Sequence, residues 1–282
     1  MSAPRINETI IRPKSPLQII NFRELWRYRD LLMIFVRRDL VSLYKQTILG
    51  PLWLIIQPLL TTVIFTIVFS RIAQLSTSGI HPMLFYMSGV VPWAYFANCI
   101  NKTSDTFHVN IAIFGKVYFP RIVVPLSVVI SNGISFIMQF IILIGFMFYF
   151  QGYQNITMSY QAFLLLPLLF IIMALLGLSL GIMISALTIR YRDLKFLVGF
   201  GVQLLMYASP VIFPLSSVKG KMEWVLLANP MTPVIESFRH VLFGTGELRL
   251  DYIMYSVIFT LITLVLGLFL FSRVEKKFAD TV

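Results

Sequence analysis

The chain has 282 residues, of which 58% are hydrophobic and only 12% are charged, and its formal net charge is +11. Soluble globular proteins carry roughly 25% charged residues, so a water-soluble globular protein is excluded and most of the chain should lie in lipid. The single cysteine, Cys99, excludes an intrachain disulfide and is expected to be a buried apolar side chain.

Residues 1–48 are expected to form a cytoplasmic segment without a cleavable signal, because the first long apolar run begins only after Lys45. Within this segment, residues 22–45 have the periodicity of an amphipathic helix. Its apolar side is expected to include Leu25, Trp26, Met33 and Val36. The short apolar run inside it cannot cross a bilayer, so the sequence predicts a helix that lies at the membrane interface.

The rest of the chain, residues 49–282, is expected to form one all-α polytopic domain with six transmembrane helices. A crossing helix needs roughly 20 mostly apolar residues, and the uncharged runs supply six such segments. The predicted spans are residues 49–70, 82–103, 122–150, 160–189, 196–213 and 252–272. Most of the 23 Lys and Arg residues fall on one side of these spans. The positive-inside rule therefore places both termini in the cytoplasm, and membrane lipids rather than nucleic acid account for the basic charge.

Three connecting segments carry additional patterns. On the cytoplasmic side, residues 105–118 favour a short helix lying against the membrane or a partner, and residues 190–195 form a tight charged turn. On the external side, residues 214–250 contain two short helical patterns separated by the breaker "NPMTP" at 229–233. The second of these helices is expected to be capped by Thr232, with Pro233 at its first position, and to end at Gly244. These two helices are predicted to be re-entrant or to cover the outer mouth.

Several kinds of chemistry are absent from the sequence. There is no G-x-x-x-x-G-K-[ST] loop for binding ATP, and the three histidines at 81, 108 and 240 do not have metal-ligand spacing. No carboxylate lies inside a predicted span, which argues against an ion-coupled carrier. Gly177, Gly181 and Ser185 form a stripe of small residues that predicts close helix packing.

Five motifs together resemble the membrane subunit of type-2 ABC transporters, and among these the exporters of O-antigen and other polysaccharides, with teichoic acid exporters also similar. The motifs are "KQTILGPLWLIIQPLL" at 45–60, "GVVPWAYFANCI" at 89–100, "FGKVYFPRIVVPL" at 114–126, "IRYRDLK" at 189–195, and "YASPVIFPLS" at 207–216 followed by "LANPMTPVIESFRHVLFG" at 227–244. The resemblance implies a homodimeric permease in the bacterial inner membrane that moves a lipid-linked polysaccharide. Two copies of a separate cytoplasmic ATPase would bind ATP and Mg²⁺, so no cofactor is expected on this chain, which is not itself an enzyme.

The resemblance also implies roles for particular residues. Contacts to the ATPase are expected from residues 22–45, which would be the family's interface helix, and from residues 105–118, which would be its coupling helix. Within these contacts and the cytoplasmic turn 190–195, the expected residues are Phe114, Lys116, Tyr118, Arg190, Arg192 and Asp193. The lipid diphosphate is expected near Arg37, Arg38 and Lys45, because guanidinium groups suit phosphate; ordinary anchoring to lipid headgroups is the alternative. Pore aromatics that stack on sugar rings are expected at Phe65, Phe69, Tyr86, Trp93, Tyr95 and Phe96, with helix packing as the alternative. An external gate is expected at Pro230, Pro233, Glu236, Phe238 and Arg239.

Three other functions remain open from the sequence. A small-molecule or drug exporter of the same superfamily would share this architecture. An ion-coupled lipid-glycan flippase is disfavoured by the absence of carboxylates in the spans. A membrane-bound glycan-modifying enzyme would need an acid/base pair, for which the external candidates are Glu223, Glu236, Glu247 and Asp251.

Overall fold

The computed structural model describes residues 22–45, 48–117, 119–150, 162–188, 191, 193–245 and 248–279, and all of its regular elements in these ranges are helices. The first half comprises α1 (Phe22–Arg27), α2 (Arg29–Tyr44), η1 (Gly50–Leu52), α3 (Trp53–Phe65), η2 (Thr66–Ile72), α4 (Pro82–Ser104), α5 (Thr106–Val109), α6 (Ile111–Phe114) and α7 (Val123–Phe150). The second half comprises α8 (Ala162–Thr188), α9 (Leu194–Tyr207), η3 (Leu215–Ser217), α10 (Lys221–Leu227), α11 (Met231–Phe243) and α12 (Leu250–Ala279).

Five helices are long and apolar enough to cross a membrane. They are Gly50–Ile72, Pro82–Ser104, Val123–Phe150, Leu164–Thr188 and Leu250–Glu275, and they correspond to the first, second, third, fourth and sixth predicted spans. The chain is therefore an all-helical polytopic membrane protein over its described residues. The predicted fifth span differs, because α9 has 14 residues and is about 21 Å long, which is shorter than the roughly 30 Å hydrocarbon core.

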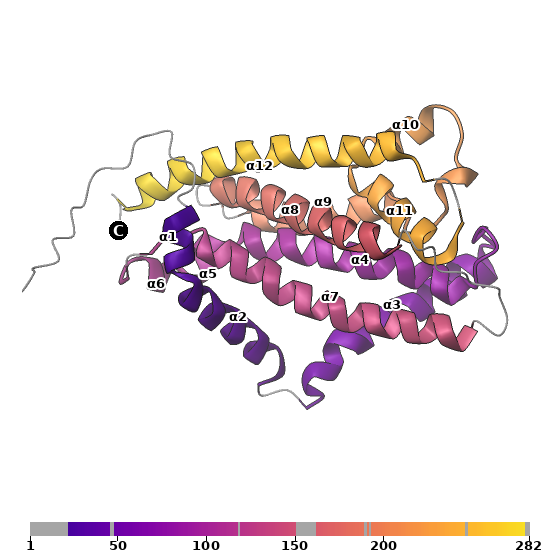
Figure 1. Ribbon diagram of the computed structural model, residues 1–282, viewed down its shortest axis with the longest axis horizontal. Coiled ribbons are helices and arrows are strands. Elements are labelled where there is room, and N and C mark those ends of the chain that lie inside the picture. Colours follow the sequence, from indigo (N-terminus) through magenta and orange to yellow (C-terminus); the bar gives the residue numbers. More distant parts are fainter. Residues whose placement is uncertain are drawn as a thin grey trace, which may run out of the picture.

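The long helices lie side by side, with α12, α8, α4 and α7 following one another across the bundle (Figure 1). Helix α4 is the central element, since 78% of its apolar window is buried. One end of the bundle carries α1, α5, α6 and the last turns of α12, and the opposite end carries α10 and α11 (Figure 1). We refer to these as the α5–α6 end and the α10–α11 end.

Small residues allow α8 to approach its neighbours closely. A Cβ atom added at Gly177 would lie 2.7 Å from Cβ of Cys99, and one added at Gly181 would lie 2.6 Å from Cβ of Thr103. On the other side of α8, Ser179 Oγ lies 3.0 Å from Thr263 Oγ1 of α12. The predicted small-residue stripe is thus confirmed as a packing surface, and Cys99 is fully buried in it.

The N-terminal helix is interrupted, and only part of its apolar side packs against the bundle. Tyr28 separates α1 from α2 with ψ 17°, so the two parts do not share one continuous apolar stripe. The structure buries Phe35 and Val36 against the bundle, whereas Trp26 and Met33 are 71% and 60% exposed. An interfacial helix turns such apolar side chains toward lipid, so the exposure of Trp26 and Met33 is compatible with the predicted position of this segment at the membrane interface, which stays a prediction.

Candidate functional site

The segment between α4 and α7, residues 105–122, lies at the centre of the α5–α6 end, and we call it the hub. It consists of two single turns, α5 and α6, in place of the one short helix that the sequence predicts. The break falls at Asn110, which has φ −110° and whose side-chain amide donates to the carbonyl of Thr106 at 2.9 Å. An asparagine that bonds its local backbone in this way competes with helix continuation.

Polar contacts tie this hub to three other helices. Arg38 Nη1 of α2 donates to Asn110 Oδ1 at 3.0 Å. His108 Nε2 lies 3.0 Å from the carbonyl oxygen of Thr188, the last residue of α8. Lys195 of α9 forms an ion pair with Asp105, whose side chain is only 12% exposed. A displacement of α5–α6 would therefore be transmitted to α2, α8 and α9 at once.

An aromatic cluster supports the same hub from within. It consists of Phe35, Phe107, Phe114, Phe119 and Phe271, with ring centroids between 5.0 and 5.7 Å apart. Arg121 covers this cluster, with its guanidinium carbon 5.5 Å from the Phe114 ring, and its Nη1 donates to the backbone carbonyl of Glu275 at 2.9 Å. Burial lowers the pKa of Arg121, and the nearby Glu275 carboxylate opposes that shift.

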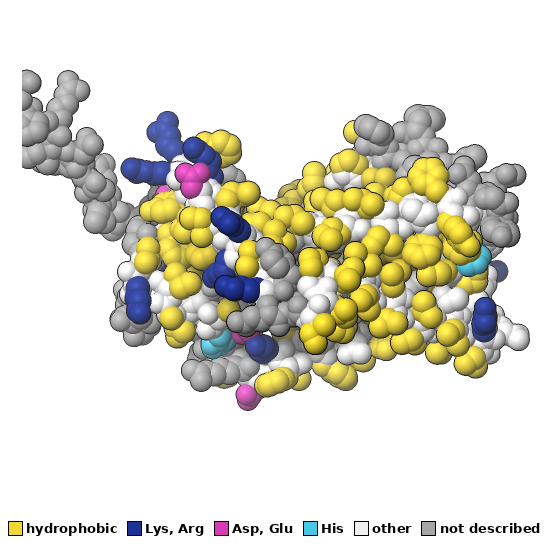
Figure 2. Space-filling view, turned by 90° about the horizontal axis from the view of Figure 1, so that it is seen from below, with side chains coloured by type: hydrophobic (Ala, Val, Ile, Leu, Met, Phe, Trp, Pro, Cys, Tyr) yellow, Lys and Arg dark blue, Asp and Glu magenta, His cyan; other side chains and the backbone are white. Residues whose placement is uncertain are grey.

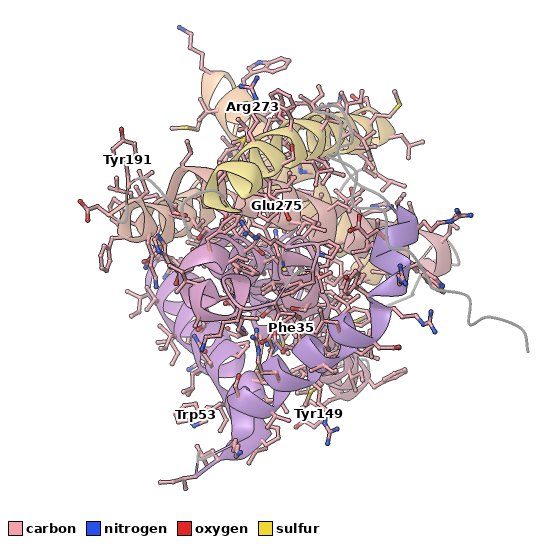
Figure 3. The ribbon with its side chains drawn as sticks, turned by 90° about the vertical axis from the view of Figure 1, so that its left-hand side faces the viewer. Phe35, Trp53, Tyr149, Tyr191, Arg273 and Glu275 are labelled. Atoms are coloured by element: carbon pink, nitrogen blue, oxygen red, sulfur yellow. The ribbon has the colours of Figure 1, made fainter. Side chains whose placement is uncertain are left out.

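The outer surface of the hub exposes apolar side chains among basic ones. Val109, Ile111 and Val117 are 68%, 47% and 57% exposed, and Lys116 is exposed beside them. Figure 2 shows basic side chains gathered at this end of the molecule, with hydrophobic side chains over most of the remaining face. Tyr191 points away from the bundle at the same end, whereas Glu275 lies toward its axis (Figure 3).

The sequence-predicted ATPase contacts have different positions in the structure. Phe114 is 6% exposed inside the aromatic cluster, so it supports the hub rather than presenting a contact surface. Lys116 and Asp193 are exposed. Tyr118, Arg190 and Arg192 lie outside the described residues. Val109 and Ile111 lie within the predicted short helix 105–118 but were not singled out, and the Asp105–Lys195 ion pair was missed because its two residues are 90 apart in sequence.

Of the three basic residues assigned to a lipid diphosphate, Arg37 and Lys45 are exposed. Arg38 is already engaged, since its Nη2 lies 2.8 Å from Asp39 Oδ1 and its Nη1 binds Asn110. Arg38 thus ties α2 to Asn110, but its side chain is still 39% exposed, so its contact to the lipid diphosphate stays a prediction.

A polar stripe on α7 that the sequence analysis did not identify runs beside this region. Asn132 Oδ1 accepts a hydrogen bond from Lys102 Nζ at 3.0 Å, and Gln139 Nε2 donates to the carbonyl of Leu54 at 2.8 Å. The stripe thus joins α7 to α4 and to the start of α3. Besides Asn132, the stripe contains Ser127, Ser131, Ser135 and Gln139, and all five are buried. The last four are spaced four residues apart, a periodicity that the sequence does contain.

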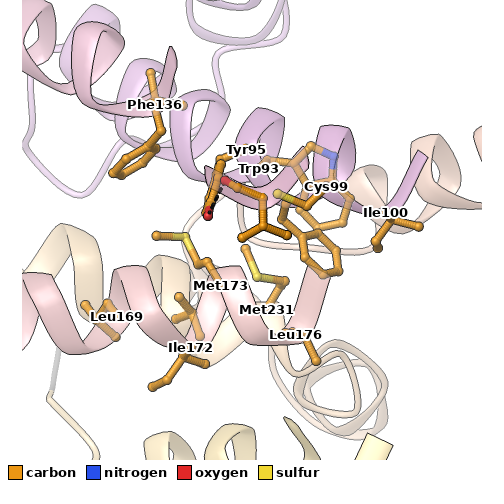
Figure 4. Packing of buried hydrophobic residues seen from close by; sticks show 14 of the residues in the cluster. Trp93, Tyr95, Cys99, Ile100, Phe136, Leu169, Ile172, Met173, Leu176 and Met231 are labelled. Carbon is orange, nitrogen blue, oxygen red and sulfur yellow. Dashed lines mark hydrogen bonds between the residues drawn. The ribbon is translucent and has the colours of Figure 1, made fainter. Parts of the chain in front are cut away.

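The aromatic residues assigned to a pore divide into two groups. Tyr86, Trp93, Tyr95 and Phe96 of α4 are at most 4% exposed. Figure 4 shows Trp93 and Tyr95 packed opposite Leu169, Ile172 and Met173 of α8. Rings buried within one protomer cannot touch a glycan at its surface, so the structure assigns these four to helix packing. Phe65 and Phe69 are half-buried, and their assignment to a pore stays a prediction.

At the α10–α11 end, a buried arginine organises the structure. Arg239 of α11 is 2% exposed. Its guanidinium donates to the carbonyls of Phe85 at 3.3 Å, Val211 at 3.0 Å and Pro210. It lies 3.8 Å above the Phe85 ring and 3.4 Å from Glu236 Oε1. Burial lowers the pKa of Arg239 to about 10 while Glu236 opposes the shift, so the group stays charged at neutral pH.

The remaining residues assigned to a gate are anchors within the fold. Pro230 accepts a hydrogen bond from Ser256 Oγ of α12 at 2.8 Å, and Phe238 is buried with its ring 5.7 Å from that of Phe140. Pro233 is buried as well. Helix α11 begins at Met231, before the predicted cap Thr232, whose hydroxyl instead donates to the carbonyl of Leu226 at 2.6 Å. Its predicted end is confirmed, because Gly244 has φ 69°, a left-handed conformation that favours glycine.

Within the described residues, no group of three or more His, Cys, Asp or Glu side chains is placed to hold a metal ion. The arrangement is that of a helical bundle with exposed apolar and basic side chains at one end and, at the other, a helical hairpin held by the buried Arg239.

Comparison with known proteins shows the family. A sequence model of the ABC-2 type transporter family matches residues 30–243, from α2 to the end of α11. The O-antigen export system permease protein RfbA of Klebsiella pneumoniae is 30% identical over 251 residues, which cover 89% of this chain and 94% of that protein. An RfbA of Myxococcus xanthus is 25% identical over 263 residues, covering 92% and 98%. The polysialic acid transport protein KpsM of Escherichia coli is 24% identical over 243 residues, covering 85% and 91%. The chain therefore belongs to the ABC-2 type transporter family.

Proposed function

We propose that this chain is the permease subunit of an ABC exporter that moves a lipid-linked polysaccharide of the O-antigen type across the bacterial inner membrane. The observation that carries this proposal is the nearly full-length similarity to O-antigen permeases of two organisms. The same similarity favours a polysaccharide over a small molecule or drug as substrate. Family membership makes a separate ATPase, rather than an ion gradient, the source of energy.

The α5–α6 end of each protomer is the proposed docking surface for one of the two copies of that ATPase. Val109, Ile111 and Val117 offer exposed apolar contact beside the basic side chains of this end, and exposed apolar patches mark interaction sites. The polar contacts of Asn110, His108 and Asp105 would pass a push on this surface to α2, α8 and α9. Arg37, Arg38 and Lys45 remain the proposed contacts to the lipid diphosphate. Lys116, Asp193, Tyr118, Arg190 and Arg192 remain proposed contacts to the ATPase.

Six membrane crossings with both termini in the cytoplasm are proposed from the path of the chain. Helix α8 ends beside α5, whereas α12 begins beside α10 and α11. The segment that contains α9 must therefore carry the chain from one end of the bundle to the other, which supplies a sixth crossing although α9 alone is too short. The positive-inside rule places the α5–α6 end in the cytoplasm, so the α10–α11 hairpin is the proposed external gate, with Glu236, Phe238 and Arg239 holding it in place.

A homodimer is proposed because α3 and α9 leave their apolar faces without a partner in one protomer. Only 11% of the apolar window that contains α3 is buried. Helix α9 exposes Phe196, Phe200 and Tyr207, and α3 exposes Trp53. These rings, rather than those of α4, are the proposed aromatic surface of the glycan path, together with Phe65 and Phe69.

The proposal is tested by co-purification of the ATPase with this chain and by measuring the polysaccharide on the cell surface. The chain would be expressed with the ATPase encoded beside it, and Val109→Asp at the α5–α6 end would be compared with Met222→Asp, a control that changes an exposed side chain at the opposite end. We expect wild type and the control to retain the ATPase and Val109→Asp to lose it, because a charge would be buried without a partner. Deleting the gene should remove long surface polysaccharide and leave drug susceptibility unchanged. A folded wild-type chain that never retains an ATPase would refute the proposal.

A further inference from the structure

A cavity of about 630 Å³ opens at the α10–α11 end. This volume is in the range of small-molecule binding sites, roughly 300–1,000 Å³. Its walls come from six parts of the chain: the connection before α4, the start of α4, the connection between α9 and α10, α10 itself, α11, and the start of α12 with the residues before it. None of the ATPase-docking or lipid-contact residues discussed above lines it.

The cavity has a preformed wall. Glu236 Oε1 accepts a hydrogen bond from the backbone N–H of Leu215 at 3.1 Å and lies 3.4 Å from Arg239 Nη1. The guanidinium of Arg239 is in turn fixed by the carbonyls of Phe85 and Val211. Since these contacts join α11, α4 and the connection after α9, the wall keeps its shape without a ligand.

Charges of both signs line the cavity in near balance. Its cations are Lys219, Arg239 and Arg249, and its carboxylates are Glu223 and Glu236. Asp251, just outside, lies 2.9 Å from Arg249 Nη2 and neutralises it. Among the residues that the structure describes, neither Lys219 nor Glu223 forms a salt bridge, so both remain able to bind a ligand. A balanced cavity of this kind does not select for an anion.

Hydroxyl groups and aromatic rings complete the lining. Ser78, Ser216, Ser237 and Thr245 contribute hydroxyls, and Phe85 and Tyr252 contribute rings. Hydroxyls, carboxylates and an ammonium group can satisfy a ligand that both donates and accepts many hydrogen bonds. Aromatic rings provide an apolar surface beside them. Neutral sugars combine these requirements, because every hydroxyl donates and accepts while the ring carbons present C–H groups.

We propose that this cavity binds uncharged sugar residues of the exported glycan at the outer side of the membrane. The proposal rests on the proposed function and extends it, because it adds a sugar-binding site behind the α10–α11 hairpin and separate from the path between protomers. Glu223 and Lys219 bind the sugar hydroxyls directly, and Glu236 and Arg239 shape the wall. A sugar held there would resist backward movement of the chain between power strokes.

The direct test measures binding of neutral trisaccharides. Saturation-transfer NMR would be recorded on the permease–ATPase complex in nanodiscs with mannotriose and maltotriose, and with the acidic trisaccharide trigalacturonate for comparison. We expect binding of a neutral trisaccharide and binding about tenfold weaker in the double variant Lys219→Ala/Glu223→Ala, because hydrogen bonds to charged groups are lost. Met222→Ala is the matched control, since Met222 is exposed on the same helix but does not line the cavity.

A second measurement locates the site. The Ser216→Cys variant places a thiol at the cavity rim, and the native Cys99 is fully buried and will not react. A membrane-impermeant maleimide added to intact cells should label this variant, and the bound trisaccharide should slow labelling in the purified complex.

Three results would overturn the inference. They are absence of trisaccharide binding to a wild-type complex, binding that the double variant leaves unchanged, and binding of trigalacturonate alone. The first of these, obtained on a complex that retains its ATPase and restores surface polysaccharide, would leave the proposed function standing. A wild-type complex that neither retains its ATPase nor restores surface polysaccharide would instead refute the proposed function.

Discussion

The contact between α4 and α8 makes a quantitative prediction for Gly181→Ala. The new Cβ would lie 2.6 Å from Cβ of Thr103, 2.9 Å from its Cγ2 and 3.3 Å from the carbonyl oxygen of Cys99. Carbon atoms pack best at about 3.5–4.0 Å, so the two helices must separate by about 1 Å. Overpacking of this kind costs about 1–3 kcal/mol, and the better helix propensity of alanine offsets up to about 1 kcal/mol. We expect a net loss of about 1–2 kcal/mol.

Gly145→Ala is the matched control, because it makes the same chemical change in a helix where no atom lies within 4 Å of the new Cβ. That variant should be neutral or up to about 1 kcal/mol more stable. Unfolding would be followed by circular dichroism during titration of detergent-solubilised protein with sodium dodecyl sulfate. The further change Thr103→Gly should recover part of the loss in Gly181→Ala, because it removes the atoms that clash. If Gly181→Ala is as stable as Gly145→Ala, the close α4–α8 contact is wrong.

The remaining predictions concern the two ends of the bundle. Replacing Arg239 by Leu should cost about 3–5 kcal/mol, because the Phe85 and Val211 carbonyls lose their donor and Glu236 loses its cation; a denaturation midpoint equal to wild type would contradict this. Burial lowers the pKa of His81 below its usual 6.5, so the unfolded chain binds a proton more readily and stability should fall as pH drops through about 6.5. Melting temperatures between pH 8 and pH 5 would test this, and His81→Gln should flatten the profile. Lys195→Ala should lower the stability of the fold by at most about 1 kcal/mol, because the Lys195 side chain is 55% exposed. Exchanging the two charges as Asp105→Lys/Lys195→Asp should restore wild-type stability. A double variant that is less stable than Lys195→Ala would count against the ion pair.

Local sequence patterns were sufficient for the elements whose signal is contained within one segment. A membrane-spanning helix is recognised from its length and hydropathy alone, and five predicted spans correspond to helices of the right length. The end of α11 at Gly244 follows from the residue's ability to adopt positive φ. The stripe at Gly177 and Gly181 likewise predicted close packing, because small residues at four-residue spacing leave a groove on one side of a helix.

The same local patterns failed where a residue's environment depends on distant segments. An aromatic ring has the same local signal whether it faces a pore or another helix, and only the position of α8 shows that Trp93 and Tyr95 are buried. Phe114 was assigned to the ATPase contact through the family resemblance, and only the tertiary structure shows that Phe107, Phe119 and Arg121 lie around it.

What the sequence by itself determined is therefore the class of protein, five of its six predicted spans as long apolar helices, and the family to which the motifs point. What only the tertiary structure decided is which charged side chains meet. Arg239 receives its partners from residues 85, 210, 211 and 236, and Lys195 reaches Asp105 across 90 residues of chain. Apart from the Glu236–Arg239 pair, which is three residues apart in one helix, these contacts form between segments far apart in sequence, so no local periodicity encodes them. They arise only when burial of the apolar helices brings these segments together. A charged group that is buried in this way must then find a partner, because an unpaired buried charge costs a large amount of free energy.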